Sequence, residues 1–186
     1  RRDDIHVVAH EYFNRDWHPM HFATMAKWLE PAKLTYACSA HYLDYVESVN
    51  LTPEQQAFLK DIHDPMFKQT VLDFMVNQQF RKEYWVKGAR RLTPLEQTQG
   101  LRDQRLVMTA HRPDVVLKVT GALGEATLTE KVYAPVLDLM ADHKMRSVSQ
   151  IEQALKDAGI TFAQLIQALL VLCGNGTLSA AQDDTA

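Results

Sequence analysis

Two neighbouring stretches decide the predicted fold: SVSQIEQALKDAG at residues 147–159 and TFAQLIQALLVLCG at residues 161–174. Each begins with serine or threonine, followed three positions later by glutamine. In such a capping box the two side chains satisfy free N–H groups of the first helical turn. Each stretch also ends in glycine, which closes helices in the left-handed conformation. We therefore expect two consecutive helices, then a tight Asn175-Gly176 turn and a short final strand at residues 177–179.

The sequence before these helices has a different periodicity. Between residues 106 and 128, three short stretches are β-branched or alternate between apolar and polar residues, as strands do. Gly121 and Gly124 allow a hairpin turn between the last two stretches. A further helix is expected at residues 130–142, where apolar side chains recur at helical spacing. A hairpin, three helices and a terminal turn predict a winged-helix-like C-terminal domain, residues 101–186.

The first half contains three helix starts of one kind. Thr52-Pro53, Asp64-Pro65 and Thr93-Pro94 each place a capping residue before a proline. Proline suits the first helical position because an N–H there would have no helical partner. Another helix is expected between Pro19 and Pro31. Residues 1–100 are therefore predicted to form a helical N-terminal domain, and the fold class to be mainly α with small β elements.

The composition is that of a globular chain. Of its 186 residues, 46% are hydrophobic and 23% charged, with a formal net charge of −3. A disordered chain would have fewer apolar residues and more net charge. No apolar run approaches the roughly 18–20 residues of a membrane span, so we expect no membrane partner and a cytoplasmic location. Cys38 and Cys173 predict reduced thiols, and the initial Arg predicts a piece of a longer protein.

The spacing of the glycines excludes the usual nucleotide sites. Phosphate-binding loops use glycine because its backbone can approach the ligand closely. None of the seven glycines falls in a G-x-G-x-x-G or G-x-x-x-x-G-K pattern, and no serine stands in G-x-S-x-G. The sequence therefore predicts no cofactor and no catalytic residue in this chain.

Histidines are concentrated near the beginning, with four of the eight in the first 21 residues. His10-Glu11 begins like the zinc-protease motif H-E-x-x-H, but Asn14 stands where the second histidine should be. His18 and His21 are one helical turn apart at best, a spacing that could hold a metal weakly. One hypothesis is therefore an independent metal-binding protein or enzyme using His10, Glu11, His18 and His21. The other is that these histidines are polar residues at a helix start.

Residues 79–105 carry a local excess of positive charge, with seven basic and three acidic residues. Phe80, Tyr84 and Trp85 lie among them, a mixture that suits nucleic acid or an acidic partner. A solvated strand or helix edge explains the same charges. The C-terminal part is not expected to bind DNA, because residues 157–186 contain three Asp and no Lys or Arg and would repel phosphate. We therefore predict no nucleic-acid partner.

Two motifs resemble those of a known family. They are His10-Glu11-Tyr12 with Asn14, Trp17, Pro19 and Phe22, and Asp73-Phe74 followed by Asn77-Gln78-Gln79-Phe80-Arg81-Lys82. Both are similar to motifs of the methyltransferase regulatory domain, which follows the catalytic domain in a group of bacterial S-adenosylmethionine-dependent methyltransferases. The resemblance covers roughly residues 10–95, and residues 100–180 resemble the C-terminal extension of such proteins. Related architectures occur in protein-lysine methyltransferases of bacterial outer-membrane proteins.

The resemblance implies a non-catalytic region that regulates the enzyme, positions its substrate or holds a dimer. Its partners would be a methyltransferase catalytic domain upstream, a protein substrate and a second copy of the chain. S-adenosylmethionine would bind the parent enzyme outside this chain. The candidate contact residues are polar, cationic and aromatic, as in many binding interfaces: Glu11, Asn14, Trp17, Phe80, Arg81, Arg90 and Arg91.

Overall fold

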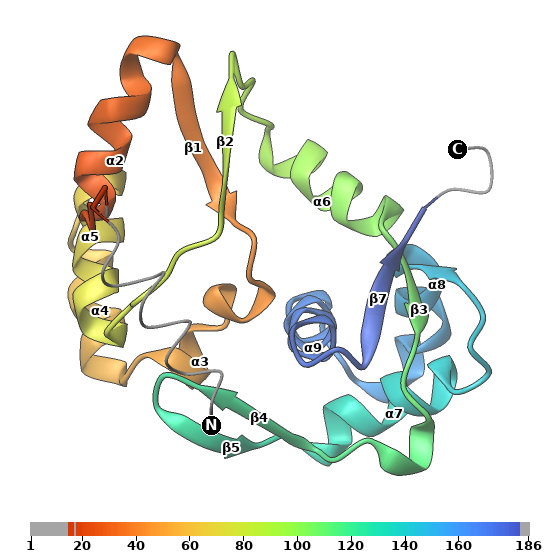
Figure 1. Ribbon diagram of the computed structural model, residues 1–186. Coiled ribbons are helices and arrows are strands. Elements are labelled where there is room, and N and C mark those ends of the chain that lie inside the picture. The colour runs from red at the N-terminus through yellow and green to blue at the C-terminus, as the bar shows by residue number, and fades with distance from the viewer. Residues whose placement is uncertain (1–14, 17, 183–186) are drawn as a thin grey trace.

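The computed structural model describes residues 15–16 and 18–182. Its elements fall into two groups (Figure 1). The elements of the first group, in chain order, are α2 (Phe22–Leu29), the 3-10 helix η1 (Glu30–Ala32), β1 (Leu34–Ser39), the 3-10 helix η2 (Tyr42–Tyr45), α3 (Glu47–Asn50), α4 (Pro53–Lys60), α5 (Pro65–Val76) and β2 (Glu83–Lys87).

The remaining elements begin with α6 (Pro94–Asp103), which leads from the first group to the second (Figure 1). After it come β3 (Arg105–Met108), η3 (Arg112–Asp114), β4 (Lys118–Gly121), β5 (Gly124–Thr127), α7 (Glu130–Met140), β6 (Arg146–Ser147), α8 (Val148–Ala154), η4 (Lys156–Ala158), α9 (Phe162–Gly174) and β7 (Leu178–Ala181).

The first group is built on a two-stranded antiparallel sheet. Strand β1 pairs with β2 in a register that places Tyr36 opposite Trp85. The ring of Phe22, from α2, lies 5.1 Å from the Tyr36 ring and 5.7 Å from the Trp85 ring, between centroids. Such tilted and edge-on aromatic contacts are favourable beyond the area they bury. This cluster joins α2 to the sheet.

The second group holds most of the fully buried side chains. Its three-stranded antiparallel sheet has the order β6-β3-β7, and α7, α8 and α9 contribute to the same core. The largest completely buried side chains include Met108, Leu137, Met140 and Leu172. Val46 and Val49, beside and within α3 of the first group, also belong to this cluster. One apolar core therefore connects the two groups.

The helix starts predicted from capping residues are confirmed. Complete capping boxes begin α4, α6, α8 and α9, and the Asp64 side chain caps α5 by accepting from two backbone N–H groups. These motifs could be predicted because each hydrogen bond spans only two or three residues. Helix α2 begins at Phe22, later than the predicted start at Pro19, and Pro31 lies within η1 rather than after it.

The predicted fold class is wrong. The expected hairpin forms as β4–β5, but it is a separate sheet that contacts α3, where the Leu123 N–H donates to the Val49 carbonyl at 3.2 Å. After α9 the described chain forms one strand, β7, which pairs with β3 instead of forming a wing. Strands thus form three antiparallel sheets distributed over both groups, and no winged-helix domain is present in the described residues. The arrangement of the sheets depends on strands that pair although they are far apart in the sequence, such as β3 and β7.

Two further predictions can be compared with the fold. Cys38 and Cys173 are free and half-buried, as expected of reduced thiols, and burial raises the pKa of the Cys173 thiol to about 11. Within residues 18–182, no helix is long and apolar enough to cross a membrane. The division of the chain near residue 100 stays a prediction.

Gly121 supplies a test of how the hairpin docks. A Cβ at this position would overlap the Val49 carbonyl oxygen and approach the Asn50 Oδ1 within 2.8 Å. We expect Gly121→Ala to lower the free energy of unfolding by about 1–3 kcal/mol through overpacking, measured by urea denaturation. Gly100→Ala is the control, because a Cβ there meets nothing within 4 Å inside α6. Alanine should stabilise that helix by up to about 1 kcal/mol. Equal effects of the two changes would contradict the docking.

Candidate functional site

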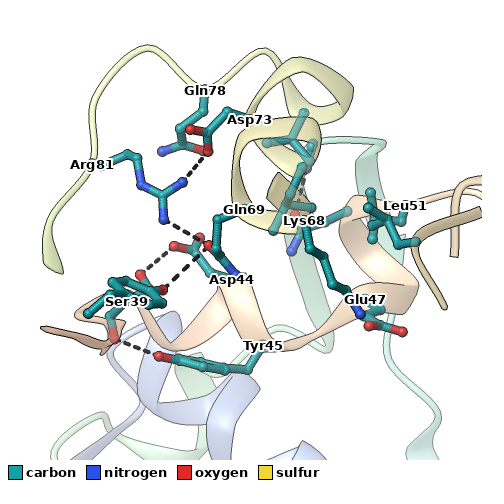
Figure 2. A pocket seen from close by; sticks show the side chains of 16 residues that line it. Ser39, Asp44, Tyr45, Glu47, Leu51, Lys68, Gln69, Asp73, Gln78 and Arg81 are labelled. Carbon is teal, nitrogen blue, oxygen red and sulfur yellow. Dashed lines mark hydrogen bonds and ion pairs between the residues drawn. The ribbon is translucent and has the colours of Figure 1, made fainter. Parts of the chain in front are cut away.

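A cavity of about 370 Å³ opens between α5, the end of β1, η2 and α3 (Figure 2). We refer to it as the α5–η2 pocket. Its lining combines charged and polar side chains with apolar ones. The residues that line it are Tyr36, Ser39, Asp44, Tyr45, Glu47, Asn50, Leu51, Leu59, Lys68, Gln69, Leu72, Asp73, Val76, Gln78, Arg81 and Ala122.

Arg81 makes ion pairs and a hydrogen bond with several neighbouring side chains of this lining. Its guanidinium makes ion pairs with Asp73 of α5 and Glu83 of β2 and donates from Nη2 to the Gln69 Oε1 at 2.8 Å. Figure 2 shows Arg81 between Asp73 and Gln69 at the upper wall. The guanidinium also lies 4.3 Å from the centroid of the Phe22 ring, a distance at which cation–π attraction is significant.

One guanidinium is shared between two carboxylates at this wall. Burial raises the pKa of the Asp73 carboxyl; the positive charge of Arg81 acts against this shift, and the charge of Glu83 adds to it. Burial likewise raises the pKa of the Tyr36 hydroxyl. The wall therefore carries excess negative charge in surroundings that stabilise ions poorly.

The opposite wall is held by short-range hydrogen bonds. Ser39 donates its hydroxyl to Asp44, and the Tyr45 hydroxyl donates to the Ser39 carbonyl oxygen at 2.8 Å (Figure 2). Burial raises the pKa of Tyr45. Asn50 donates to the Leu43 carbonyl at 2.7 Å and accepts from the Ala122 N–H at 2.9 Å. The hydrogen bond between Ala122 and Asn50 holds the β4–β5 turn beside the pocket.

Glu47 and Lys68 supply the groups that are open to a ligand. Both line the α5–η2 pocket, and Figure 2 shows their side chains at the end of the cavity away from Arg81. Within the described part of the chain, neither side chain forms an ion pair or hydrogen bond. A carboxylate and an ammonium group can bind polar groups of either sign, so the arrangement suits a polar ligand or peptide segment.

The structure brings together only some of the residues predicted from sequence. Phe80 and Arg81 both line a second cavity, of about 400 Å³, against α2 and α5. Arg90 and Arg91 are exposed in the segment between β2 and α6 and line neither cavity. Arg90 pairs with Glu96 at 2.9 Å. Glu11, Asn14 and Trp17 lie outside the described residues.

The residues of the metal hypothesis are placed only in part. His10 and Glu11 lie outside the described residues. His18 is exposed, and the His21 ring lies 5.4 Å from the Phe74 ring. Among residues 15–16 and 18–182, no three His, Cys, Asp or Glu side chains are grouped as metal ligands would be.

Sequence reasoning missed several pocket residues. Asp44, Glu47 and Lys68 lie in no motif, and no sequence signal would have grouped them. For the ion pair of Arg81 with Asp73 the sequence did offer one indication, because both residues belong to the second resembled motif. Asn77, between them, ends α5 in the left-handed conformation at φ 51°, which turns the chain back and lets Arg81 reach Asp73.

Comparison with known proteins identifies the region around this pocket. Residues 4–87 match the profile of a family described as the predicted methyltransferase regulatory domain. This match of residues 4–87 confirms the resemblance drawn from the two sequence motifs. The match includes α2, α5, β1, β2 and Arg81.

Similar proteins are considerably longer than this chain. Over 185 residues the chain is 37% identical to an uncharacterized protein, sll1526, of Synechocystis sp., of which it spans 36%. The fold resembles PKMT2 from Rickettsia typhi, with a TM-score of 0.58 and 15% identity over 95% of this chain and 39% of that one. PKMT2 in complex with AdoHcy gives a TM-score of 0.56 and 16% identity, covering 97% of this chain and 40% of that one.

We predict that Arg81 stabilises the domain far more than Arg90. Replacing Arg81 with Met keeps an apolar stem but leaves Asp73 and Glu83 facing each other without a cation. Because the Arg81 side chain is only 20% exposed, the expected loss is about 2–4 kcal/mol in the free energy of unfolding. Arg90→Met, at a side chain that is 71% exposed, should cost less than about 1 kcal/mol. Urea denaturation of both variants measures the difference, and similar losses would disprove it.

Proposed function

We propose that this chain is the non-catalytic accessory region of an S-adenosylmethionine-dependent methyltransferase. Its catalytic domain would precede it in a longer polypeptide. The match of residues 4–87 to the regulatory-domain family carries this proposal. Further support comes from the relatives, of which the chain spans only 36–40%. In a protein as long as these relatives, the larger part would lie outside this chain and could contain the catalytic domain.

The proposed cofactor follows from the same comparison. PKMT2 in complex with AdoHcy shares the fold of this chain over 40% of its own length. The seven glycines of this chain, by contrast, match no dinucleotide or phosphate-loop pattern. We therefore assign S-adenosylmethionine to the parent enzyme, outside these 186 residues.

Within the proposed enzyme, the chain would position a protein substrate or hold a dimer. The exposed side chains Phe80, Arg90 and Arg91 are of the types that dominate binding interfaces, and Glu11, Asn14 and Trp17 are proposed to act with them. The connections of Arg81 to Asp73 and Glu83 suit a positioning role, in which it orders the wall of the α5–η2 pocket beside those contacts.

Calorimetric titration with S-adenosylhomocysteine tests where the cofactor binds. We expect the full-length gene product to bind it and residues 1–186 alone to give no binding heat, because the cofactor site lies in the preceding part. Circular dichroism of the shorter chain is the control that it is folded. Binding of comparable affinity by the 186-residue chain would overturn the proposal.

Changing Arg90 and Arg91 tests the contact with substrate. In the full-length enzyme, Arg90→Ala with Arg91→Ala should reduce labelled methyl transfer to acceptor proteins of a cell extract several-fold, through a raised KM. Binding of S-adenosylhomocysteine and the thermal midpoint should not change, because both side chains are exposed. Lys144→Ala with Lys156→Ala, which removes two charges from the second group, is the matched control. Transfer equal to that of the control would remove the arginine pair from the proposed contact.

A further inference from the structure

The charges around the α5–η2 pocket do not balance. The charged side chains that line it are Asp44, Glu47, Lys68, Asp73 and Arg81. The guanidinium of Arg81 is also paired with Glu83, which is outside the lining and whose side chain is only 9% exposed. Among these described residues, four carboxylates therefore share two cations. Because a partly desolvated cavity stabilises uncompensated charge poorly, a bound positive charge would be favoured there.

Two of the carboxylates are not paired with a cation. Asp44, in η2, accepts a hydrogen bond from the Ser39 hydroxyl, and a neutral donor leaves the negative charge in place. Glu47, in α3, forms no ion pair or hydrogen bond within residues 15–16 and 18–182. Both belong to the wall opposite α5, and Figure 2 shows their side chains beside the cavity. The uncompensated charge therefore lies where a ligand in the cavity could reach it.

The rest of the lining indicates which kind of cation fits. Aliphatic side chains from three segments line the same cavity, namely Leu51, Leu59, Leu72 and Val76. An alkyl chain can pack against such side chains while its charged end stays among polar groups. A metal ion fits less well, since no three His, Cys, Asp or Glu of the described residues are grouped as its ligands would be. The volume of about 370 Å³ is at the lower end of the range for small-molecule sites, roughly 300–1,000 Å³.

We propose that the α5–η2 pocket binds an aliphatic amine, whose ammonium group pairs with Glu47 and Asp44 and whose alkyl chain lies against the aliphatic side chains of the lining. A second ammonium group, as in a diamine, would meet the carboxylates that share Arg81. Two sources offer this chemistry: a free diamine and the lysine side chain of a protein. The inference goes beyond the proposed function, and its test measures binding without methyl transfer.

Lys68 distinguishes an amine site from an anion site. Its ammonium group lines the pocket and is unpaired within the described part of the chain. It would repel a bound amine and compete with it for Glu47, whereas it would attract a bound anion. Removal of this charge should therefore strengthen the binding of an amine.

Calorimetric titration of the full-length gene product tests the proposal, with diaminopentane, neutral pentanediol and anionic glutarate as matched probes. We expect binding heat from the diamine alone. Glu47→Gln should weaken diamine binding several-fold, and Lys68→Met should strengthen it several-fold. The matched control is Glu54→Gln, an exposed glutamate in the first turn of α4 that does not line the pocket. It should leave the affinity unchanged, and circular dichroism of each variant checks that it is folded.

A second pair of probes distinguishes the two sources. A tripeptide with blocked ends and the sequence Ala-Lys-Ala is compared with the same peptide carrying norleucine, which keeps the alkyl chain without the charge. Tighter binding of the lysine peptide than of the diamine would make the site one for a protein side chain. Binding of the diamine alone would make it a site for a free amine.

Three results would overturn the proposal. One is that neither the diamine nor the lysine peptide binds. Another is binding of pentanediol or the norleucine peptide as tight as that of the amines, which would show that charge is not recognised. The third is binding of glutarate that Lys68→Met abolishes, which would make the pocket an anion site. Equal losses in Glu47→Gln and Glu54→Gln would likewise place the amine outside the pocket.

Discussion

The first group of elements depends on a single guanidinium. Arg81 lies in the segment between α5 and β2, pairs with Asp73 and Glu83 on those two elements, and lies against the Phe22 ring of α2. The ring centroid of Tyr36, in β1, lies 5.9 Å from the same guanidinium. Four elements therefore meet at one cation. A partly buried charge held by two carboxylates and an aromatic ring fixes orientation strongly, because any rearrangement would leave charges unpaired.

The contacts of Arg81 compensate for the small number of buried apolar side chains in the first group. The first group has few completely buried side chains, whereas the second contains most of the core. With so little apolar burial, ion pairs and aromatic contacts must define how α2, α5 and the two strands fit together. The same scarcity leaves Phe67 and Phe74 exposed, so that the first group presents exposed aromatic rings as well as the α5–η2 pocket that Arg81 lines.

The two resembled motifs gain a physical meaning from this geometry. Asp73, Asn77 and Arg81 of the second motif are a charge partner, a left-handed helix end and the cation that the turn brings back. Phe22 of the first motif supplies the ring beneath that cation. These motif residues therefore hold elements together. Exposed Phe80, from the same motif, is left available for contact with another surface.

The sequence by itself determined the local structure. Capping residues and prolines predicted where α4, α5, α6, α8 and α9 begin, because these interactions span only a few residues. The two motifs also predicted the family. The sequence could not determine which strands pair, since β1 and β2, or β3 and β7, are separated by dozens of residues and short strands accept many partners. Nor could it group Glu47 and Lys68 with Arg81. Tertiary structure alone decided the three sheets, the docking of the hairpin on α3 and the α5–η2 pocket, because each depends on contacts between segments that only folding brings together.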